Sequence, residues 1–370
     1  MDKTRNNYFS KTDSLCLKGI AITIMMFFHC FCSVERFKNY TVIFEPFSQD
    51  FIVKLTSTFN ICVSIFAFVT GYGLYLSASK RCVDAKSIKK WSIDRYIKTF
   101  SGYWVVYLLS FVITYIYQSY PYQVYFKKNF IRGIAYIFTD FLGFSDLFGT
   151  PTLCGTWWYM SAALIFIVLV PIIIKTSKKI GYVPVIIMII VLPRILDLGY
   201  LTGTSPYSFL LALIAGMIFA QYNVFEKLLN IKLIRNKRLD DIVQFILWTA
   251  LLIASLYVWV KLEKSKYWEY HYALQPLISI FYCRKYIIRI PVVNKILAFL
   301  GKHSMNIFLV HTFFRYTFFR DFTYSFKYFW LIAIVLLGIS LGVSILIELL
   351  KKIIRYDKFV SKLSEKTANT

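Results

Sequence analysis

The sequence lacks any long polar segment that could form a sizeable soluble domain. Of its 370 residues, 58% are hydrophobic, and the mean hydropathy is +0.58. Apolar runs recur from residue 15 to residue 350. A soluble protein of this length could not bury so much apolar surface. The sequence therefore predicts an all-α, polytopic transmembrane helical bundle, with residues 1–370 forming a single integral membrane domain.

Acidic residues are scarce, with 19 Asp and Glu against 43 Lys and Arg, so that the formal net charge is +24. Such an excess of positive charge can indicate binding to nucleic acid. Here, however, the cations cluster in short loops between apolar runs. We therefore expect no nucleic-acid partner and assign the charge to the surface of a membrane.

Cysteine pairs with metal-ligand spacing are also absent. Cys30 and Cys32 are too close together for the usual motifs, and Cys16, Cys62, Cys154 and Cys283 lie in or beside apolar stretches. Free cysteines in such stretches behave as small apolar side chains. We expect all seven to be packing thiols and predict no metal site.

The first apolar run is not followed by a convincing small-residue cleavage site, so we expect an uncleaved membrane anchor. About ten runs have the 17–25 residues that a bilayer requires. Segment 130–148 is apolar but interrupted by Gly and Asp, and we predict a re-entrant or interfacial helix there. The predicted spans are residues 15–34, 55–79, 96–118, 156–175, 181–199, 206–222, 240–261, 270–286, 296–316 and 328–350.

Lys and Arg crowd alternate loops between these spans, which indicates the side that faces the cytoplasm. The loop 80–95 is strongly basic, and we place it inside, whereas we place the loop 118–155 outside. An even number of spans then puts both termini in the cytoplasm, with tails at 1–14 and 351–370. This topology predicts Lys18 near the inner surface and His29 in the outer half of the first span.

Lys18 and His29 stand out because both interrupt one apolar run, Leu15 to Cys32. Their spacing places both side chains on one face of a helix, about 16 Å apart along its axis. Ionisable groups at such depth are costly and usually mark a functional site. A histidine there could also simply hydrogen-bond within the bundle, and Lys18 could be an anchor whose ammonium group extends to the interface.

Four further stretches carry unusual residues for a membrane span. Residues 59–76 contain a Gly-aromatic-Gly break, Gly71-Tyr72-Gly73, and residues 155–171 open with the paired tryptophans Trp157 and Trp158. Residues 91–104 place Arg95 and Lys98 on one helix face. Residues 299–311 close with His311, which shares a helix face with Ser304. No acidic residue accompanies that pair, so we do not expect a catalytic triad.

Taken in order, these motifs resemble the acyltransferase 3 family of integral membrane acyltransferases. That family carries a basic residue, ten spacers and a histidine in its first helix, like Lys18 to His29 here. Thr70-Gly71-Tyr72 is similar to the motif of its second helix, and Arg95-x-x-Lys98 to the basic pair that begins its third. The Trp-rich helix start and the stretch Gly301–His311 also match, so that the resemblance covers the whole chain. Lys18 and Lys98 replace arginines, which loses the guanidinium fork.

The resemblance implies transfer of an acyl group to a hydroxyl of an extracytoplasmic or lipid-linked saccharide, in the plasma or inner membrane of a bacterium. The expected donor is acyl-CoA, with acetyl-CoA first, and the expected partners are that donor, the saccharide and membrane lipid. His29 would be the general base, since imidazole accepts protons near neutral pH. Lys18, Arg95 and Lys98 would bind the donor phosphates, and Trp157 and Trp158 would contact substrate or form an aromatic belt.

Two other functions are compatible with the sequence. A transporter or exporter of a polysaccharide or lipid-linked sugar could use His29 as a proton relay, but transporters often contain internal repeats and none is visible here. A sensor is disfavoured because no appended domain is present. For the enzyme, both direct transfer across the membrane and a covalent acyl relay remain open, and nothing in the sequence indicates an oligomeric state.

Overall fold

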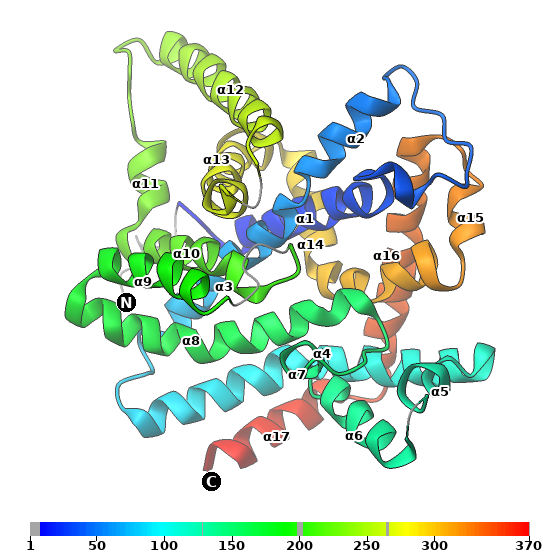
Figure 1. Cartoon of the computed structure of the whole chain (residues 1–370). Helices are drawn as coiled ribbons and strands as arrows, with labels where there is room; N and C mark the ends of the chain where they lie inside the picture. Colours follow the sequence, from blue (N-terminus) through cyan, green and yellow to red (C-terminus); the bar gives the residue numbers. More distant parts are fainter. Residues whose placement is uncertain (1–7, 128, 198–202, 264–265, 370) are drawn as a thin grey trace. The chain divides into compact units, whose positions relative to one another are not determined.

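The fold is described from a computed structural model, which covers residues 8–127, 129–197, 203–263 and 266–369 (Figure 1). Within these ranges the chain forms helices and no strand, apart from an isolated bridge between Ile43 and Tyr328. The predicted all-α class is therefore confirmed. The start of the predicted N-terminal tail, residue 370 and the end of the span 181–199 lie outside the described residues.

The helices follow one another along the whole chain. The α-helices are α1 (Lys11–Phe31), α2 (Gln49–Thr58), α3 (Ile61–Ala78), α4 (Ala85–Gln118), α5 (Tyr120–Tyr125), α6 (Phe130–Phe141), α7 (Ser145–Phe148), α8 (Trp158–Ile180), α9 (Tyr182–Ile195), α10 (Leu210–Tyr222), α11 (Val224–Leu229), α12 (Lys237–Lys261), α13 (Gln275–Tyr282), α14 (Pro291–Thr312), α15 (Arg320–Tyr324), α16 (Phe329–Ile353) and α17 (Tyr356–Asn369). Short 3₁₀ turns form η2 (Val34–Arg36), η3 (Gly155–Trp157) and η4 (Pro206–Phe209), and π-helical turns form η5 (Tyr270–Leu274), η6 (Cys283–Ile287) and η7 (Phe313–Thr317).

Six helical stretches in the described chain are long and apolar enough to cross a membrane. The other four predicted spans coincide with α9, α10, α13 and α14. The helical membrane bundle expected from the hydropathy pattern is thus confirmed. The six stretches are Lys11–Phe31, Gln49–Ala78, Ala85–Gln118, Gly155–Ile180, Lys237–Lys261 and Phe329–Ile353.

Four details differ from the expectations. α4 begins at Ala85, well before the predicted 96, so that most of the basic loop 80–95 is helical and the basic pair lies inside α4 instead of beginning it. α3 continues through Gly71, Tyr72 and Gly73 without a break. The C-terminal tail contains the helix α17. The segment 130–148 forms two helices, α6 and α7, joined by a turn.

Capping explains where the two helices with the basic residues begin. At α1, the Ser10 hydroxyl accepts from the backbone N–H of Asp13 at 3.1 Å, and the Asp13 carboxylate accepts from the Ser10 N–H at 2.7 Å. At α4, Asp84 and Ser87 form the same reciprocal pair, at 2.7 and 2.9 Å. Such boxes satisfy the free N–H groups of the first turn. The polar start of α4 is therefore stabilised locally, outside the apolar run.

The chain divides into two compact units. The first contains the described parts of Met1–Ser77, Ile174–Ser304 and Tyr324–Ile334. The second contains Ala78–Ile173, Met305–Thr323 and the described part of Val335–Thr370. We treat each unit by itself.

In the first unit, two pairs of helices approach so closely that only glycine fits between them. A Cβ at Gly19 would collide with the Leu297 carbonyl, and a Cβ at Gly301 would collide with the Leu15 carbonyl, so α1 and α14 exchange reciprocal contacts. Gly71 and Gly216 play the same part between α3 and α10 (Figure 1). Small residues at such crossings let helix backbones pack directly in a membrane. Gly71 of the second motif therefore has a packing role.

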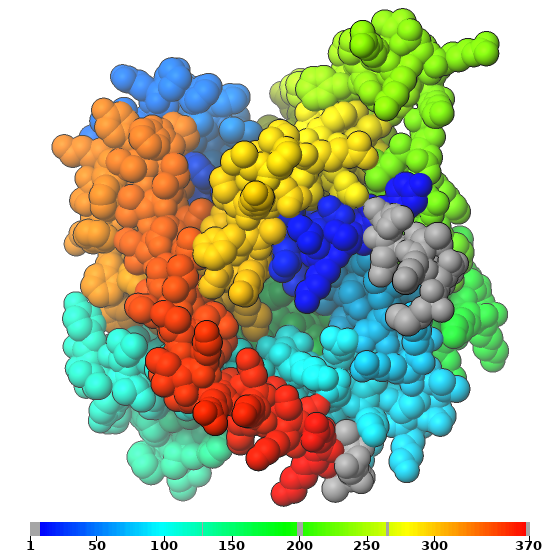
Figure 2. All heavy atoms as spheres, turned by 180° about the vertical axis from the view of Figure 1, so that it is seen from behind, coloured from blue at the N-terminus to red at the C-terminus, as the bar shows by residue number. Residues whose placement is uncertain are grey.

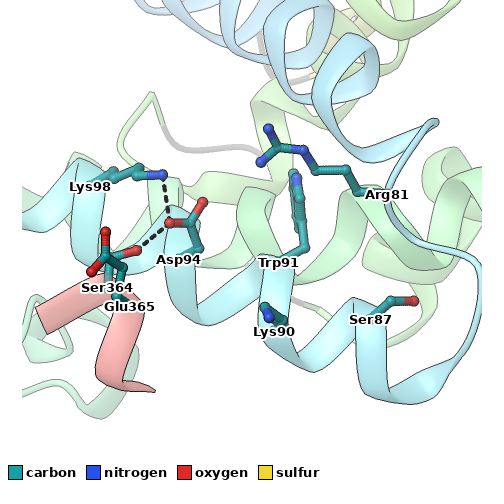
Figure 3. Close-up of a pocket in the computed structure, with 8 residues that line it drawn as sticks. All are labelled: Arg81, Ser87, Lys90, Trp91, Asp94, Lys98, Ser364 and Glu365. Atoms are coloured by element: carbon teal, nitrogen blue, oxygen red, sulfur yellow. Dashed lines mark hydrogen bonds and ion pairs between the residues drawn. The ribbon is translucent and has the colours of Figure 1, made fainter. Parts of the chain in front are cut away.

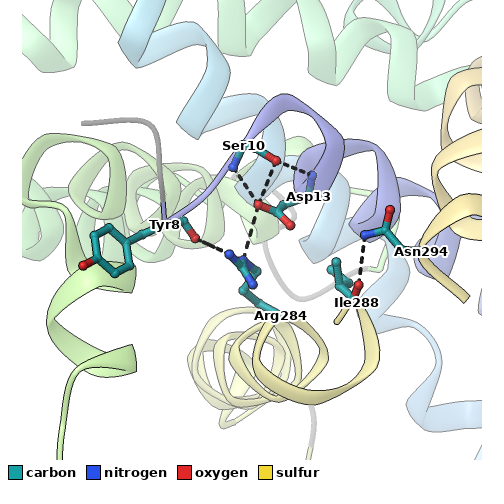
Figure 4. A network of polar contacts seen from close by, with 6 residues as sticks. All are labelled: Tyr8, Ser10, Asp13, Arg284, Ile288 and Asn294. Carbon is teal, nitrogen blue, oxygen red and sulfur yellow. Dashed lines mark hydrogen bonds and ion pairs between the residues drawn. The ribbon is translucent and has the colours of Figure 1, made fainter. Parts of the chain in front are cut away.

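Arg284 of η6 fixes the start of α1 in the same unit. Its guanidinium donates to the Tyr8 carbonyl through Nε at 3.1 Å and through Nη2 at 2.7 Å, and Nε lies 3.4 Å from the Asp13 carboxylate (Figure 4). Figure 2 shows the blue start of α1 beside the yellow segment that follows η6. The Asp13 carboxylate thus caps α1 and pairs with a cation on another element.

In the second unit, α17 packs along the N-terminal half of α4, with the two segments side by side in Figures 1 and 2. The hydroxyl of Tyr356 donates to the Ser101 carbonyl at 3.1 Å. The predicted C-terminal tail is therefore a packed helix that covers α4 where its basic residues lie.

Candidate active site

α1 carries the first two predicted site residues, in the first unit. The helix is continuous over Lys18 and His29, so both residues lie on the same helix, as expected. Both side chains are half-buried. The chain turns back after α1 ends at Phe31, where Arg36 donates to the His29 carbonyl at 3.0 Å and its guanidinium lies 5.7 Å from the Phe28 ring centroid. This turn holds the end of α1 that carries the imidazole.

A pocket of about 550 Å³ lies between α4 and α17 in the second unit (Figure 3). Lys98 lines it, whereas Arg95 does not; the Arg95 guanidinium lies 5.9 Å from the ring centroid of Trp91. The structure therefore brings the predicted basic pair to one region of α4 but puts only Lys98 at the pocket wall. The lining residues are Arg81, Ser87, Lys90, Trp91, Asp94, Lys98, Ser364 and Glu365.

The charges of the pocket are mixed. Lys98 Nζ lies 2.6 Å from the Asp94 carboxylate, which also accepts a hydrogen bond from the Ser364 hydroxyl of α17. Glu365 adds a second carboxylate, while Arg81 and Lys90 add cations. The charge on Lys98 is thus partly compensated, and with Glu365 counted, Arg81 and Lys90 leave the lining with one net positive charge. In the sequence these two residues stand out only as loop cations, although Arg81, Lys90 and Lys98 recur within one short basic stretch.

Two groups beside the pocket have shifted pKa values. The hydrogen bond from the Ser87 backbone N–H holds the pKa of the Asp84 carboxyl below its usual value. Burial raises the pKa of the Cys82 thiol, next to Arg81. Asp84 therefore stays ionised as a cap, and Cys82 stays a protonated thiol that is a poor nucleophile.

The two tryptophans lie in different environments at the start of α8. Trp157 is buried, and its indole N–H donates to the Leu309 carbonyl at 2.9 Å. Its ring packs edge-on against Tyr103, with centroids 5.2 Å apart. Trp158 is half-buried. Trp157, the last residue of η3, therefore links the start of α8 to α14, and substrate contact by either tryptophan stays a prediction.

Asp140 forms a buried carboxylate centre that the sequence did not reveal. It accepts hydrogen bonds from the Tyr125 hydroxyl at 2.5 Å, the Leu153 N–H and the Ser145 hydroxyl at 2.7 Å, and the Thr152 hydroxyl at 2.9 Å. A buried charge is tolerated when donors surround it in this way. These hydrogen bonds link α5, α6 and the segment before η3, and so the Asp140 carboxylate positions the start of α8.

His311, which ends the stretch Gly301–His311 and for which we expected no catalytic triad, is fully buried near this segment. Its Nδ1 lies 2.7 Å from the Phe308 carbonyl and its Nε2 lies 3.2 Å from the Thr312 hydroxyl. Ser304, on the same helix face, instead donates to the Gly301 carbonyl. In the described parts of the chain, no group of three or more His, Cys, Asp or Glu side chains is arranged to hold a metal ion.

Comparison with known proteins supports one family. The family model of the acyltransferase 3 family, described as an acyltransferase domain, matches residues 15–349. No match was found among curated proteins or among solved structures. The match covers nearly the whole chain, from the start of the Lys18–His29 run to the last turns of α16. With its helical membrane bundle and its motifs in order, the chain belongs to the acyltransferase 3 family of membrane acyltransferases.

Proposed function

We propose that the protein transfers an acyl group, acetyl first, from acyl-CoA to a hydroxyl of an extracytoplasmic or lipid-linked saccharide in a bacterial plasma membrane. Family membership supports the acyl transfer. The observation that carries the choice of donor is the pocket between α4 and α17, which is lined by three cations, two carboxylates and a tryptophan.

Coenzyme A carries three phosphate groups and an adenine ring, so a site for it needs cations and an aromatic surface. Arg81, Lys90 and Lys98 supply the cations around one pocket, and Trp91 supplies the aromatic surface (Figure 3). Hydrogen bonds from cations to phosphate oxygens are among the stronger polar contacts. The volume of about 550 Å³ lies within the usual range for small-molecule sites.

Arg95 has a supporting role in this proposal. Its guanidinium lies over the Trp91 ring but does not line the pocket, so it would hold the indole in position and add long-range positive charge. Lys18 remains a proposed phosphate contact on α1. His29 would remove the proton from the acceptor hydroxyl, and imidazole can do so near neutral pH.

The donor site is tested by titrating acetyl-CoA into purified protein. Replacing Arg81 and Lys90 together by Gln should weaken binding at least about tenfold, because a single charge-assisted contact contributes about 1.5–3 kcal/mol when well formed. Lys89→Gln is the matched control, since Lys89 is an exposed cation on the same helix that does not line the pocket. Equal affinity in the double variant and the control would exclude this pocket as the donor site.

Asp94 offers a test with the opposite sign. Its carboxylate compensates Lys98 at 2.6 Å, so Asp94→Asn should free that ammonium group and tighten donor binding several-fold. The Lys98→Gln change should weaken binding less than loss of Arg81 and Lys90. Weaker binding in Asp94→Asn would mean that the carboxylate itself orients the donor.

The reaction is tested by mass spectrometry of surface glycans from cells with and without the gene. We expect one acyl mass to be lost from the sugar when the gene is absent, while the amount of polymer stays the same. Loss of the polymer itself would favour the exporter. The same comparison identifies the acyl group and the acceptor sugar.

A further inference from the structure

Four side chains from two segments of the second unit form a continuous hydrogen-bonded chain. Cys154 Sγ lies 3.2 Å from Thr156 Oγ1, which lies 3.2 Å from Thr312 Oγ1. Thr312 Oγ1 in turn lies 3.2 Å from His311 Nε2. The hydrogen bond from the Trp157 indole to the Leu309 carbonyl holds the two segments in register beside this chain. A thiol and an imidazole that are far apart in sequence are therefore connected through two hydroxyl groups.

The direction of the proton path follows from the group at one end. His311 Nδ1 lies 2.7 Å from the Phe308 carbonyl, which can only accept, so Nδ1 carries the hydrogen. In the neutral ring, Nε2 then accepts from the Thr312 hydroxyl. A hydroxyl has one hydrogen, so Thr312 accepts from Thr156, and Thr156 accepts from the thiol of Cys154. Every donor points toward His311.

We propose that Cys154 is the nucleophile that carries the acyl group between donor and acceptor, with His311 as the proton acceptor through Thr156 and Thr312. This inference rests on the proposed acyl transfer and decides between its two open routes in favour of a covalent relay. It also gives Cys154 a role other than packing.

The two steps balance without any further reactant. In the first, the Cys154 sulfur attacks the thioester carbon of acyl-CoA, its proton passes to His311, and that proton leaves with the sulfur of CoA. In the second, the acceptor hydroxyl oxygen attacks the new thioester, and the hydroxyl proton ends on Cys154. A thioester is exchanged for a thioester and then converted to an ester.

The surroundings of Cys154 suit a thiol that loses its proton only when it attacks the thioester. Burial raises the pKa of the Cys154 thiol, so that it is protonated at rest and needs a base when it attacks. Gly155, between Cys154 and Thr156, is exposed, and a Cβ built there meets no atom within 4 Å. The sulfur is therefore buried one residue away from open space through which a small acyl group could approach.

The donor pocket belongs to the same unit. Tyr103 packs against Trp157, which lies next to the hydrogen-bonded path from Cys154 to His311. Tyr103 follows Lys98 of the pocket by five residues on α4, a rise of about 7.5 Å along the helix axis. The extended pantetheine arm of coenzyme A is longer than this rise. Five residues also turn the helix by about 140°, so the arm of a donor held by its phosphates at the pocket would pass around α4 to present its thioester toward Cys154.

The test is acylation of the purified protein by radiolabelled acetyl-CoA without acceptor, followed by acid quench and peptide mass spectrometry. One acetyl group should appear on Cys154 and be released by neutral hydroxylamine, which cleaves thioesters. Cys154→Ala should not be labelled, and Cys154→Ser should give either no label or a hydroxylamine-resistant ester. Cys62→Ala is the matched control, because Cys62 is also buried, and it should label like the natural protein.

The proton path has its own readout. Thr156→Val and Thr312→Val keep the side-chain shape but break the path, and each should slow labelling of Cys154 at least about tenfold. Thr139→Val, which removes a hydroxyl outside the path, should not. His311→Gln should slow labelling of Cys154 to a similar degree, because an amide can hydrogen-bond to Thr312 but cannot accept the proton.

The outcomes separate this inference from the proposed function. Acylation of a saccharide acceptor by Cys154→Ala at the natural rate would overturn the relay while leaving the acyltransferase intact. Label on a different residue would do the same. If the natural protein neither labels nor transfers acetyl groups to any acceptor, both proposals fail together.

Discussion

His29 is the residue whose replacement distinguishes chemistry from packing. Because an amide can hydrogen-bond but cannot accept a proton at neutral pH, His29→Gln should lower the transfer rate roughly 10²–10⁴-fold if His29 is the general base. Expression should stay normal. The control is His271→Gln: His271 is buried with both ring nitrogens within 3.0 Å of backbone carbonyls, so its loss should affect stability and not the rate per folded molecule. A His29→Gln variant that transfers acyl groups at the rate of the natural protein would exclude His29 as the general base.

Asp140, unlike His29, should contribute to the stability of the fold and not to the transfer rate. Asp140→Asn places an amide among donors that need an acceptor, and leaving a buried donor unsatisfied costs about 1–3 kcal/mol. We expect a lower midpoint of thermal unfolding in detergent. Asp146→Asn is the matched control and should leave the midpoint unchanged, because Asp146 belongs to the same segment but is exposed. Equal midpoints for both variants would show that the Asp140 hydrogen bonds add little.

At the scale of single elements, the crossing of α1 and α14 gives the sharpest prediction. Gly301→Ala puts a methyl group against the Leu15 carbonyl, so the helices must separate, and overpacking of this kind costs about 1–3 kcal/mol. Gly338→Ala on α16 is the matched control, because nothing lies within 4 Å of its Cβ position. Alanine favours helix there, so stability should stay equal or rise. A destabilised control with an unaffected Gly301 variant would contradict the proposed contact.

Hydropathy predicted the elements well where the helix and the apolar run coincide. Within the described residues, each expected span corresponds to a helical segment, since a bilayer leaves backbone groups few other ways to be satisfied. α4 is the exception. Its first turns are polar, and the capping pair of Asp84 and Ser87 begins the helix before the apolar run does. The capping motif can be seen in the sequence, but hydropathy alone does not predict that a helix begins there.

At the scale of the whole molecule, the topology is open to direct measurement. Cysteine introduced at Lys86 should react with an impermeant reagent only after the membrane is permeabilised, whereas cysteine at Asp146 should react in intact cells. Both positions are exposed. Cys32, Cys82 and Cys283 should first be replaced by serine, because the other four native cysteines are buried. Modification at 86 but not at 146 in intact cells would invert the orientation.

The candidate site was predictable only in part. Lys18, His29, Arg95 and Lys98 could be found because each interrupts or begins an apolar run. The partners of these residues could not be found from the sequence. Asp94, for example, pairs with Lys98 and accepts a hydrogen bond from Ser364, which lies on a helix far away in the sequence. Cys154 and His311 are connected through threonines that are 156 residues apart. The repeat of a helix or a strand relates only residues that are close in sequence, so these partners meet only in the folded protein.

The glycine contact between α1 and α14 also has a mechanical consequence. Because Gly19 places no side chain between its own backbone and the Leu297 carbonyl, the crossing can serve as a pivot for the part of α1 that follows it. His29 lies ten residues further along, a lever arm of about 15 Å. A tilt of about 10° at Gly19 would therefore carry the imidazole roughly 2.6 Å, about the length of a hydrogen bond. If His29 is the general base, a small tilt of one helix would be enough to bring its ring nitrogen to an acceptor hydroxyl or to withdraw it.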